Sequence, residues 1–208
     1  MLILVALIAQ FRTTIEPMAE LPPTAAWRLV EAHEGFEVVF LRSDDDGLRI
    51  DGHSTGVEEG ETWAFSYSLS LDPGWATRFA RVRARTLAGE HETLLAGDGA
   101  GEWQVDGEPA SAIAGCLDVD LEGSAFTNAL PVHRLGLEVG ARAEAPAAYV
   151  RAAGLAVERL EQTYARLEDR DGHSRYDYAS PRFGYEGMLT YDEHGLVLEY
   201  PGIAVRAG

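Results

Sequence analysis

Residues 63–71 alternate between large apolar side chains and small ones. The large set is Trp63, Phe65, Tyr67, Leu69 and Leu71, and the small set is Ala64, Ser66, Ser68 and Ser70. Successive side chains of a β-strand point to opposite faces, so this pattern predicts a strand with one buried face and one solvated face. Strands of a doubly covered parallel sheet are apolar on both faces. The segment therefore favours an antiparallel sheet that covers a core with one side.

The same period recurs on both sides of this segment. Further strand-like stretches are residues 36–42, 48–52, 79–87, 91–95 and 102–105. Asp, Gly and Pro mark the turns between them, at residues 44–47, 72–74 and 97–101, because these residue types suit the backbone conformations of tight turns. The glycine-rich turn lacks the lysine of a phosphate-binding loop. Turns at this spacing are typical of antiparallel sandwiches, barrels and rolls, and they argue against a Rossmann-type sheet.

The charge and the cysteine count exclude several classes of function. A net charge of -17 over 208 residues repels nucleic-acid phosphates and anionic lipid headgroups. Cys116 is the one cysteine, so neither an internal disulfide framework nor a multi-cysteine zinc site can form. The histidines are scattered without the spacing of metal ligands. We expect no metal, no cofactor and no nucleic-acid partner.

The chain begins with an apolar run, residues 1–9, that is far shorter than the roughly 20 residues a membrane-spanning helix needs. It also lacks the basic start of a secretory signal. Met18 opens a polar stretch just downstream. We interpret residues 1–26 as an arm or a misplaced translation start, and residues 27–206 as one domain. A cytoplasmic protein without a stable membrane anchor is the expectation.

Two segments have helical spacing. In residues 128–139, Asn128 suits an N-cap, Pro131 falls in the first turn, and Gly140 can end the helix. In residues 157–167, apolar side chains recur at 157, 160, 164 and 167, which by periodicity alone also predicts a helix.

Asp118 and Asp120 lie two apart on a predicted strand and share a face with Cys116. One hypothesis is a carboxylate pair for general acid–base chemistry, with Cys116 and His133 as an imaginable nucleophile and base. The competing hypothesis, which we favour, is structural: the two aspartates bond to neighbouring strands, turns or a dimer partner, since neighbours at this spacing leave little room for a sugar between opposed carboxylates.

Other candidate residues allow the same two interpretations. Arg134 can bind a carboxylate or phosphate of a ligand, or pair internally with Asp118 or Asp120. Asn128 can contact a ligand or only cap the helix. Tyr176 and Tyr178 can line a sugar-binding or acyl-binding surface, although aromatic residues at period two more often form a core.

The segment 115–135, which reads GCLDVDLEGSAFTNALPVHRL, is distinctive, and residues 162–167, 175–180 and 192–202 add matches in order. Together they resemble the putative glycolipid-binding family over residues 27–206. The resemblance implies a mainly β fold, a spiral β-roll in which a many-stranded antiparallel sheet wraps around a single α-helix, residues 128–139. It also implies a homodimer, and it makes residues 155–167 a strand, which we adopt over the helical period.

The resemblance implies a non-catalytic binder or carrier of an amphipathic ligand such as a glycolipid, held in the concavity of the roll. The residues expected at the ligand are Asp118, Asp120, Asn128, His133, Arg134, Tyr176 and Tyr178. Two alternatives stay open at this point: a hydrolase-like enzyme that uses the Asp118, Asp120 and His133 region, and a dimeric interaction module without a small ligand.

Overall fold

A computed structural model describes residues 20–208 except 32, 33, 59 and 153. The expected arm falls mostly outside the described residues, and the first strand already begins at Thr24, ahead of residue 27. Fourteen strands form one continuous sheet, in which every neighbouring pair is antiparallel. Its order is β10-β13-β14-β15-β16-β17-β1-β2-β3-β4-β5-β6-β7-β8.

The strands of this sheet are β1 (Thr24–Leu29), β2 (Glu34–Asp44), β3 (Gly47–Glu58), β4 (Glu61–Leu71), β5 (Thr77–Thr86), β6 (Gly89–Gly97), β7 (Trp103–Val105), β8 (Glu108–Pro109), β10 (Arg142–Glu144), β13 (Thr163–Arg170), β14 (His173–Ser180), β15 (Tyr185–Tyr191), β16 (Val197–Tyr200) and β17 (Ala204–Arg206). A second sheet has the order β12-β11-β9. Its strands are β9 (Asp118–Leu121), β11 (Ala147–Val150) and β12 (Val157–Leu160). The pairing of β9 with β11 is parallel, which the sequence did not predict.

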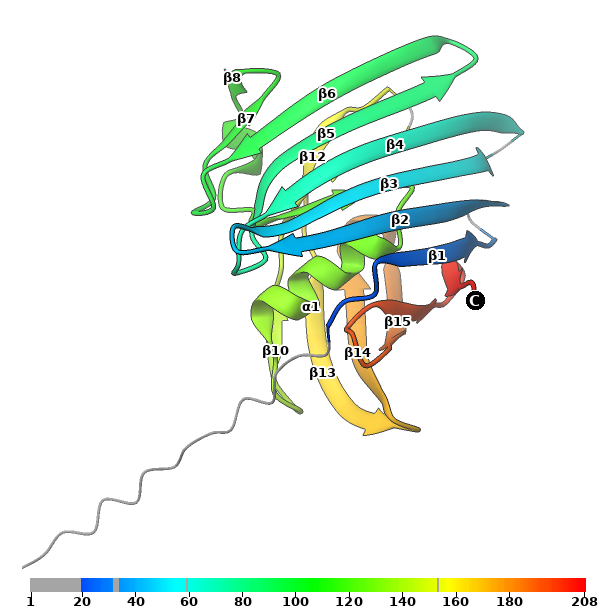
Figure 1. Ribbon diagram of the computed structural model, residues 1–208, viewed down its shortest axis with the longest axis vertical. Helices are drawn as coiled ribbons and strands as arrows, with labels where there is room; N and C mark the ends of the chain where they lie inside the picture. The colour runs from blue at the N-terminus through cyan, green and yellow to red at the C-terminus, as the bar shows by residue number, and fades with distance from the viewer. Residues whose placement is uncertain (1–19, 32–33, 59, 153) are drawn as a thin grey trace, which may run out of the picture.

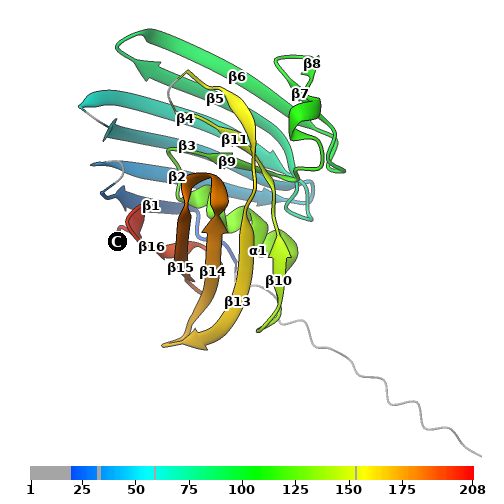
Figure 2. The same ribbon diagram turned by 180° about the vertical axis from the view of Figure 1, so that it is seen from behind.

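The described residues contain one α-helix, α1 (Ala129–Leu135), and three 3-10 turns. These turns are η1 (Ser111–Ile113), η2 (Phe126–Asn128) and η3 (Pro181–Phe183). Figures 1 and 2 show the large sheet curling so that α1 lies between the β2–β5 side and the strands β10, β13 and β14. The expected mainly β fold, with a large antiparallel sheet around a single helix, is confirmed.

The inner face of the curled sheet is the core. Large side chains from the sheet and from the helical segment are almost completely buried there; they include Trp27, Ile50, Leu69, Phe126, Leu130, Tyr164 and Tyr191. Residues 63–71 follow the predicted pattern, since the large side chains point inward and the alanine and serines point outward. Burial of this apolar face is the main force that holds the roll closed.

The helix is shorter than expected. It ends at Gly136, which takes the left-handed conformation at φ +51° and donates its backbone N–H to the Val132 carbonyl. The expected end at Gly140 is therefore wrong, and Val139 is 56% exposed instead of facing the core. The first glycine that could adopt a left-handed C-cap stops the helix.

Residues 155–167 contain strands, so the resemblance was right and the helical period was misleading. The break at residues 161–162 explains the error, because β12 belongs to the small sheet and β13 to the large one. The alternation of buried and exposed side chains starts again in β13 after this break. The interval between apolar residues of β12 and β13 therefore imitates the spacing of a helix. The turn after β13 uses Asp171 and Gly172, both at positive φ as a tight hairpin requires.

Candidate functional site

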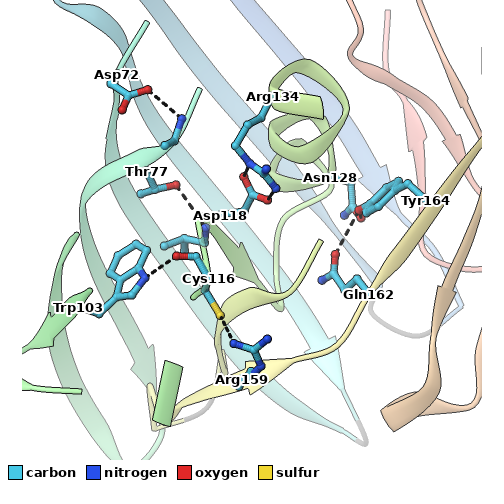
Figure 3. Close-up of polar contacts among 12 residues, drawn as sticks. Asp72, Thr77, Trp103, Cys116, Asp118, Asn128, Arg134, Arg159, Gln162 and Tyr164 are labelled. Carbon is cyan, nitrogen blue, oxygen red and sulfur yellow. Dashed lines mark hydrogen bonds and ion pairs between the residues drawn. The ribbon is translucent and has the colours of Figure 1, made fainter. Parts of the chain in front are cut away.

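Asp118 and Arg134 form the most buried ion pair at the predicted site. The Arg134 Nε donates to Asp118 Oδ1 at 2.9 Å, and its Nη2 donates to Oδ2 at 2.5 Å. Figure 3 shows the guanidinium reaching from α1 to the carboxylate on β9. Burial raises the pKa of Asp118, and the two donors from Arg134 oppose that rise. Both groups use their bidentate geometry on each other, which is the internal pairing that the sequence analysis gave as one of two interpretations of Arg134.

Asp120 has different partners. It accepts hydrogen bonds from Thr127 Oγ1 at 3.0 Å and from Gln162 Nε2 at 2.5 Å. Burial raises the pKa of Asp120 to about 6, although both donors oppose the rise. The two aspartates therefore bind separate elements. Asp118 binds α1 through Arg134, and Asp120 joins η2 to Gln162, the residue before β13. Neither aspartate lines any of the depressions described below.

His133 and Asn128 also have structural contacts. The His133 ring stacks on Trp75 with centroids 3.6 Å apart, and burial lowers its pKa to about 4. Asn128 does not cap α1 with its side chain; its Oδ1 accepts the Tyr164 hydroxyl at 3.0 Å. The structure does not bring the histidine ring and the two aspartates together as one catalytic cluster.

Tyr176 and Tyr178 lie in an aromatic cluster of the core, and only 4% and 3% of their surfaces are exposed. The Tyr178 ring centroid is 5.0 Å from that of Tyr164 and 5.6 Å from that of Tyr200. Such edge and tilted ring pairs are typical of a packed interior. In this arrangement the two tyrosines stabilise the roll and present little surface to a ligand.

Sequence reasoning missed a buried carboxylate, Glu37, at the inner face of β2. It accepts the Tyr67 hydroxyl at 2.6 Å, the Ser124 hydroxyl at 2.5 Å and the Ala125 N–H at 2.7 Å. Burial raises its pKa, and these donors oppose the rise. Strand parity was the available signal, because Glu37 shares a face with Val39 and Leu41. This network ties the segment before α1 to the sheet.

The concave side is therefore filled by α1, η2 and core side chains, and the open grooves lie elsewhere. One of them, which we call the outer groove, has a volume of about 570 Å³ on the outer face of β3–β6. Its side chains that point outward are His53, Thr55, Ala64, Ser66, Arg83, Arg85, Glu90 and Glu92. The volume is within the range of about 300–1,000 Å³ that is usual for ligand sites.

A second depression, which we call the edge pocket, has a volume of about 310 Å³ between β6, η1 and the segment before β12. It is lined by His91, Glu92, Thr93, Val105, Asp106, Ala110, Ala112, Ile113, Gly154, Leu155 and Val157. Six of these are apolar: Val105, Ala110, Ala112, Ile113, Leu155 and Val157. The outer groove and the edge pocket share His91 and Glu92.

The two depressions adjoin because β6 is only half covered. β7 pairs with β6 through Leu95, Ala96 and Gly97 alone. Among the described strands, residues 89–93 consequently form an outer edge of the sheet. The outer groove and the edge pocket therefore meet at this edge.

A family model described as "Putative glycolipid-binding" matches residues 24–206. The chain belongs to the putative glycolipid-binding family. The crystal structure of a DUF1089 family protein from Pseudomonas aeruginosa is 35% identical with a TM-score of 0.72, covering 82% of this chain and 92% of that chain.

A β-barrel-like protein of the domain of unknown function DUF1849 from Brucella abortus is 10% identical with a TM-score of 0.49. That match covers 88% of this chain and 93% of the other, and it is too distant to bear on function. No curated protein matches the sequence.

In this member of the putative glycolipid-binding family, the distinctive segment 115–135 has a packing role. It supplies β9, η2 and α1, the elements that fill the roll. Its polar side chains bond within the segment or to the strands around it: Asp118 binds Arg134, Asp120 binds Gln162, and Ser124 binds Glu37 on β2. Its Cys116 is buried, and burial raises the pKa of this thiol to about 11. The thiol is therefore protonated at neutral pH and a poor nucleophile.

Two further findings concern metals and membranes. Within the described part of the chain, no group of three or more His, Cys, Asp and Glu side chains is placed to hold a metal ion. None of the helices in that part is both long and apolar enough to cross a membrane.

Proposed function

We propose that this protein is a non-catalytic binder of an amphipathic molecule of the glycolipid type, acting in the cytoplasm as a carrier or sensor and as a homodimer. The observation that supports this most is the adjacency of the two depressions. The outer groove offers hydroxyl, imidazole, guanidinium and carboxylate groups, and the edge pocket adds six apolar residues among the eleven that line it. A molecule with a polar head and a hydrocarbon chain matches both.

The location differs from the concavity that the resemblance implied. An acyl chain on the concave face would have to displace α1 and the core side chains packed on it, which would cost far more than the chain could contribute. The edge pocket needs no such displacement. Ile113 and Leu155 are almost fully buried at its base, and Val105, Ala110 and Val157 are partly exposed to it.

The residues that the sequence analysis expected at the ligand contribute to binding indirectly, by stabilising the roll. Asp118, Asp120, Asn128, His133 and Arg134 fix the helical segment inside the roll, and Tyr176 and Tyr178 fix the strands around it. We propose that they hold the shape of the sheet whose outer face and edge contact the ligand. No described contact favours the hydrolase, because Asp118 and Asp120 each have fixed partners and His133 stacks on Trp75.

Octyl glucoside, used below its micelle-forming concentration, tests this proposal by calorimetry. We expect it to bind more tightly than glucose or octanol, because only the amphiphile occupies both depressions. Ala112→Glu places a charge in the edge pocket at an exposed position. It should weaken octyl glucoside binding about tenfold, the loss expected when about two methylene groups are no longer buried.

Ser111→Glu is the matched control, since Ser111 is the exposed neighbour of Ala112 on η1 and does not line the pocket. Its affinity for octyl glucoside should equal that of the parent chain. Equal binding of glucose and octyl glucoside, or equal effects of the two glutamates, would contradict the proposal.

A further inference from the structure

The outer groove continues along β4 as a trough with a floor of short side chains. Ala64, Ser66, Ser68 and Ser70 form this floor, since their outward positions alternate with buried aromatic and aliphatic residues. Register places longer side chains on both sides: Ser66 lies opposite His53 on β3 and Arg83 on β5, and Ser68 lies opposite Asp51 and Arg81. A strand of small residues therefore runs between two strands of large polar ones, and this difference in side-chain length forms the trough.

Two smaller depressions extend the groove. One, of about 190 Å³, shares His53, Ser66 and Arg83 with it. The next, of about 300 Å³, includes Ser70 and Arg78 at the far end of β4 and β5. From Ala64 to Ser70 the floor is about 20 Å long at the usual rise of a strand. The trough therefore has room for more than one sugar ring.

The charges along the trough are balanced. Arg83 pairs with Glu92, and Arg85 Nη1 lies 2.6 Å from Glu90 Oε1. Asp51 accepts from Ser68 Oγ at 2.7 Å and from Arg42 Nη2 at 2.9 Å. A phosphate or sulfate would have to displace these carboxylates from the arginines or lie beside them. The net charge of -17 adds a further repulsion of anions.

We infer that the outer groove binds an uncharged carbohydrate chain, longer than one sugar unit, and discriminates against phosphorylated or sulfated headgroups. This inference rests on the proposed function, because the carbohydrate is the polar end of the amphiphile that the edge pocket holds. Sugar hydroxyls donate and accept hydrogen bonds, so they can bond to arginine donors and carboxylate acceptors in the same groove without breaking the ion pairs.

The test compares octyl maltoside, octyl glucoside and octyl phosphate as probes of the full chain. We expect octyl maltoside to bind about fivefold more tightly than octyl glucoside, and octyl phosphate about tenfold more weakly than octyl glucoside. Binding of the two glycosides should change less than about twofold between about 50 mM and 500 mM NaCl, since no net charge is neutralised.

Ser66→Tyr fills the floor of the groove from an outward position, and it should weaken octyl maltoside binding about tenfold. Ala26→Tyr is its control, because Ala26 lies on the outer face of β1, which β2 separates from β3, and it lines none of the three depressions. Tighter binding of octyl phosphate, with a steep loss at high salt, would overturn the inference and leave the amphiphile proposal standing. Unchanged octyl maltoside binding by Ser66→Tyr would also overturn it. Absence of binding for all three probes would overturn both.

Discussion

Asp118→Asn is expected to lower the free energy of unfolding by about 3–5 kcal/mol at pH 7. The change removes the negative partner of Arg134, whose side chain is only 14% exposed, and leaves a largely buried guanidinium without compensation. Denaturant unfolding of the variant beside the parent chain measures this loss directly. The α1 segment should also become less protected from hydrogen exchange, because Asp118 is the residue that anchors Arg134 to β9.

Asp120→Asn is the matched comparison for Asp118→Asn, because it removes a buried carboxylate that has no ion-pair partner among the described residues. An asparagine there still offers one oxygen to Thr127 or Gln162, and it relieves the burial of a carboxylate whose pKa is raised to about 6. The expected loss is therefore at most about 1 kcal/mol. If Asp118→Asn leaves stability unchanged or raises it, the pair is not structural, and a catalytic role for Asp118 has to be reconsidered.

His133 should make the parent chain less stable in acid. The pKa of His133 is lowered to about 4 in the fold, against about 6.5 in an unfolded chain. Between these values the unfolded state binds a proton that the folded state does not, so stability falls as the pH falls from 6.5 toward 4. The difference corresponds to about 3 kcal/mol.

His133→Phe isolates this effect, because it keeps a ring against Trp75 and removes the titrating group. The raised pKa values of Asp118 and Asp120 act in the opposite direction, but they are common to both proteins. Unfolding at pH 7 and pH 4 should show that the stability of the parent chain relative to His133→Phe drops by about 3 kcal/mol. A constant difference would show that the ring is already charged or exposed in the fold.

Strand positions could be predicted from the sequence because alternation reports directly on which face is buried. Residues 63–71 show this, since each large side chain points inward as expected. The helix end and the 157–167 segment were harder to predict by periodicity. Gly136 and Gly140 are both able to end a helix, and two successive strands of different sheets, separated by residues 161–162, imitate a helical spacing.

The candidate groove could not be predicted because it depends on register among four strands. Arg83, Ser66 and His53 are far apart in sequence, and they share a row only because β3, β4 and β5 pair in one specific alignment. Arg81, Arg83 and Arg85 were visible as an alternating series, yet their pairing with glutamates on β6 decides which ligand they suit. The seven residues singled out by the resemblance proved to lie mostly inside the fold.

Native mass spectrometry of the protein purified from the cells that normally produce it tests the central claim most directly. Our account predicts a retained molecule at one copy per chain, whose fragments show neutral sugar losses and an alkyl or acyl remainder. The same preparation of Ala112→Glu should carry much less of it, and that of Ser111→Glu as much as the parent chain. A bare polypeptide mass in all three preparations, or a retained molecule without a sugar, would contradict the account.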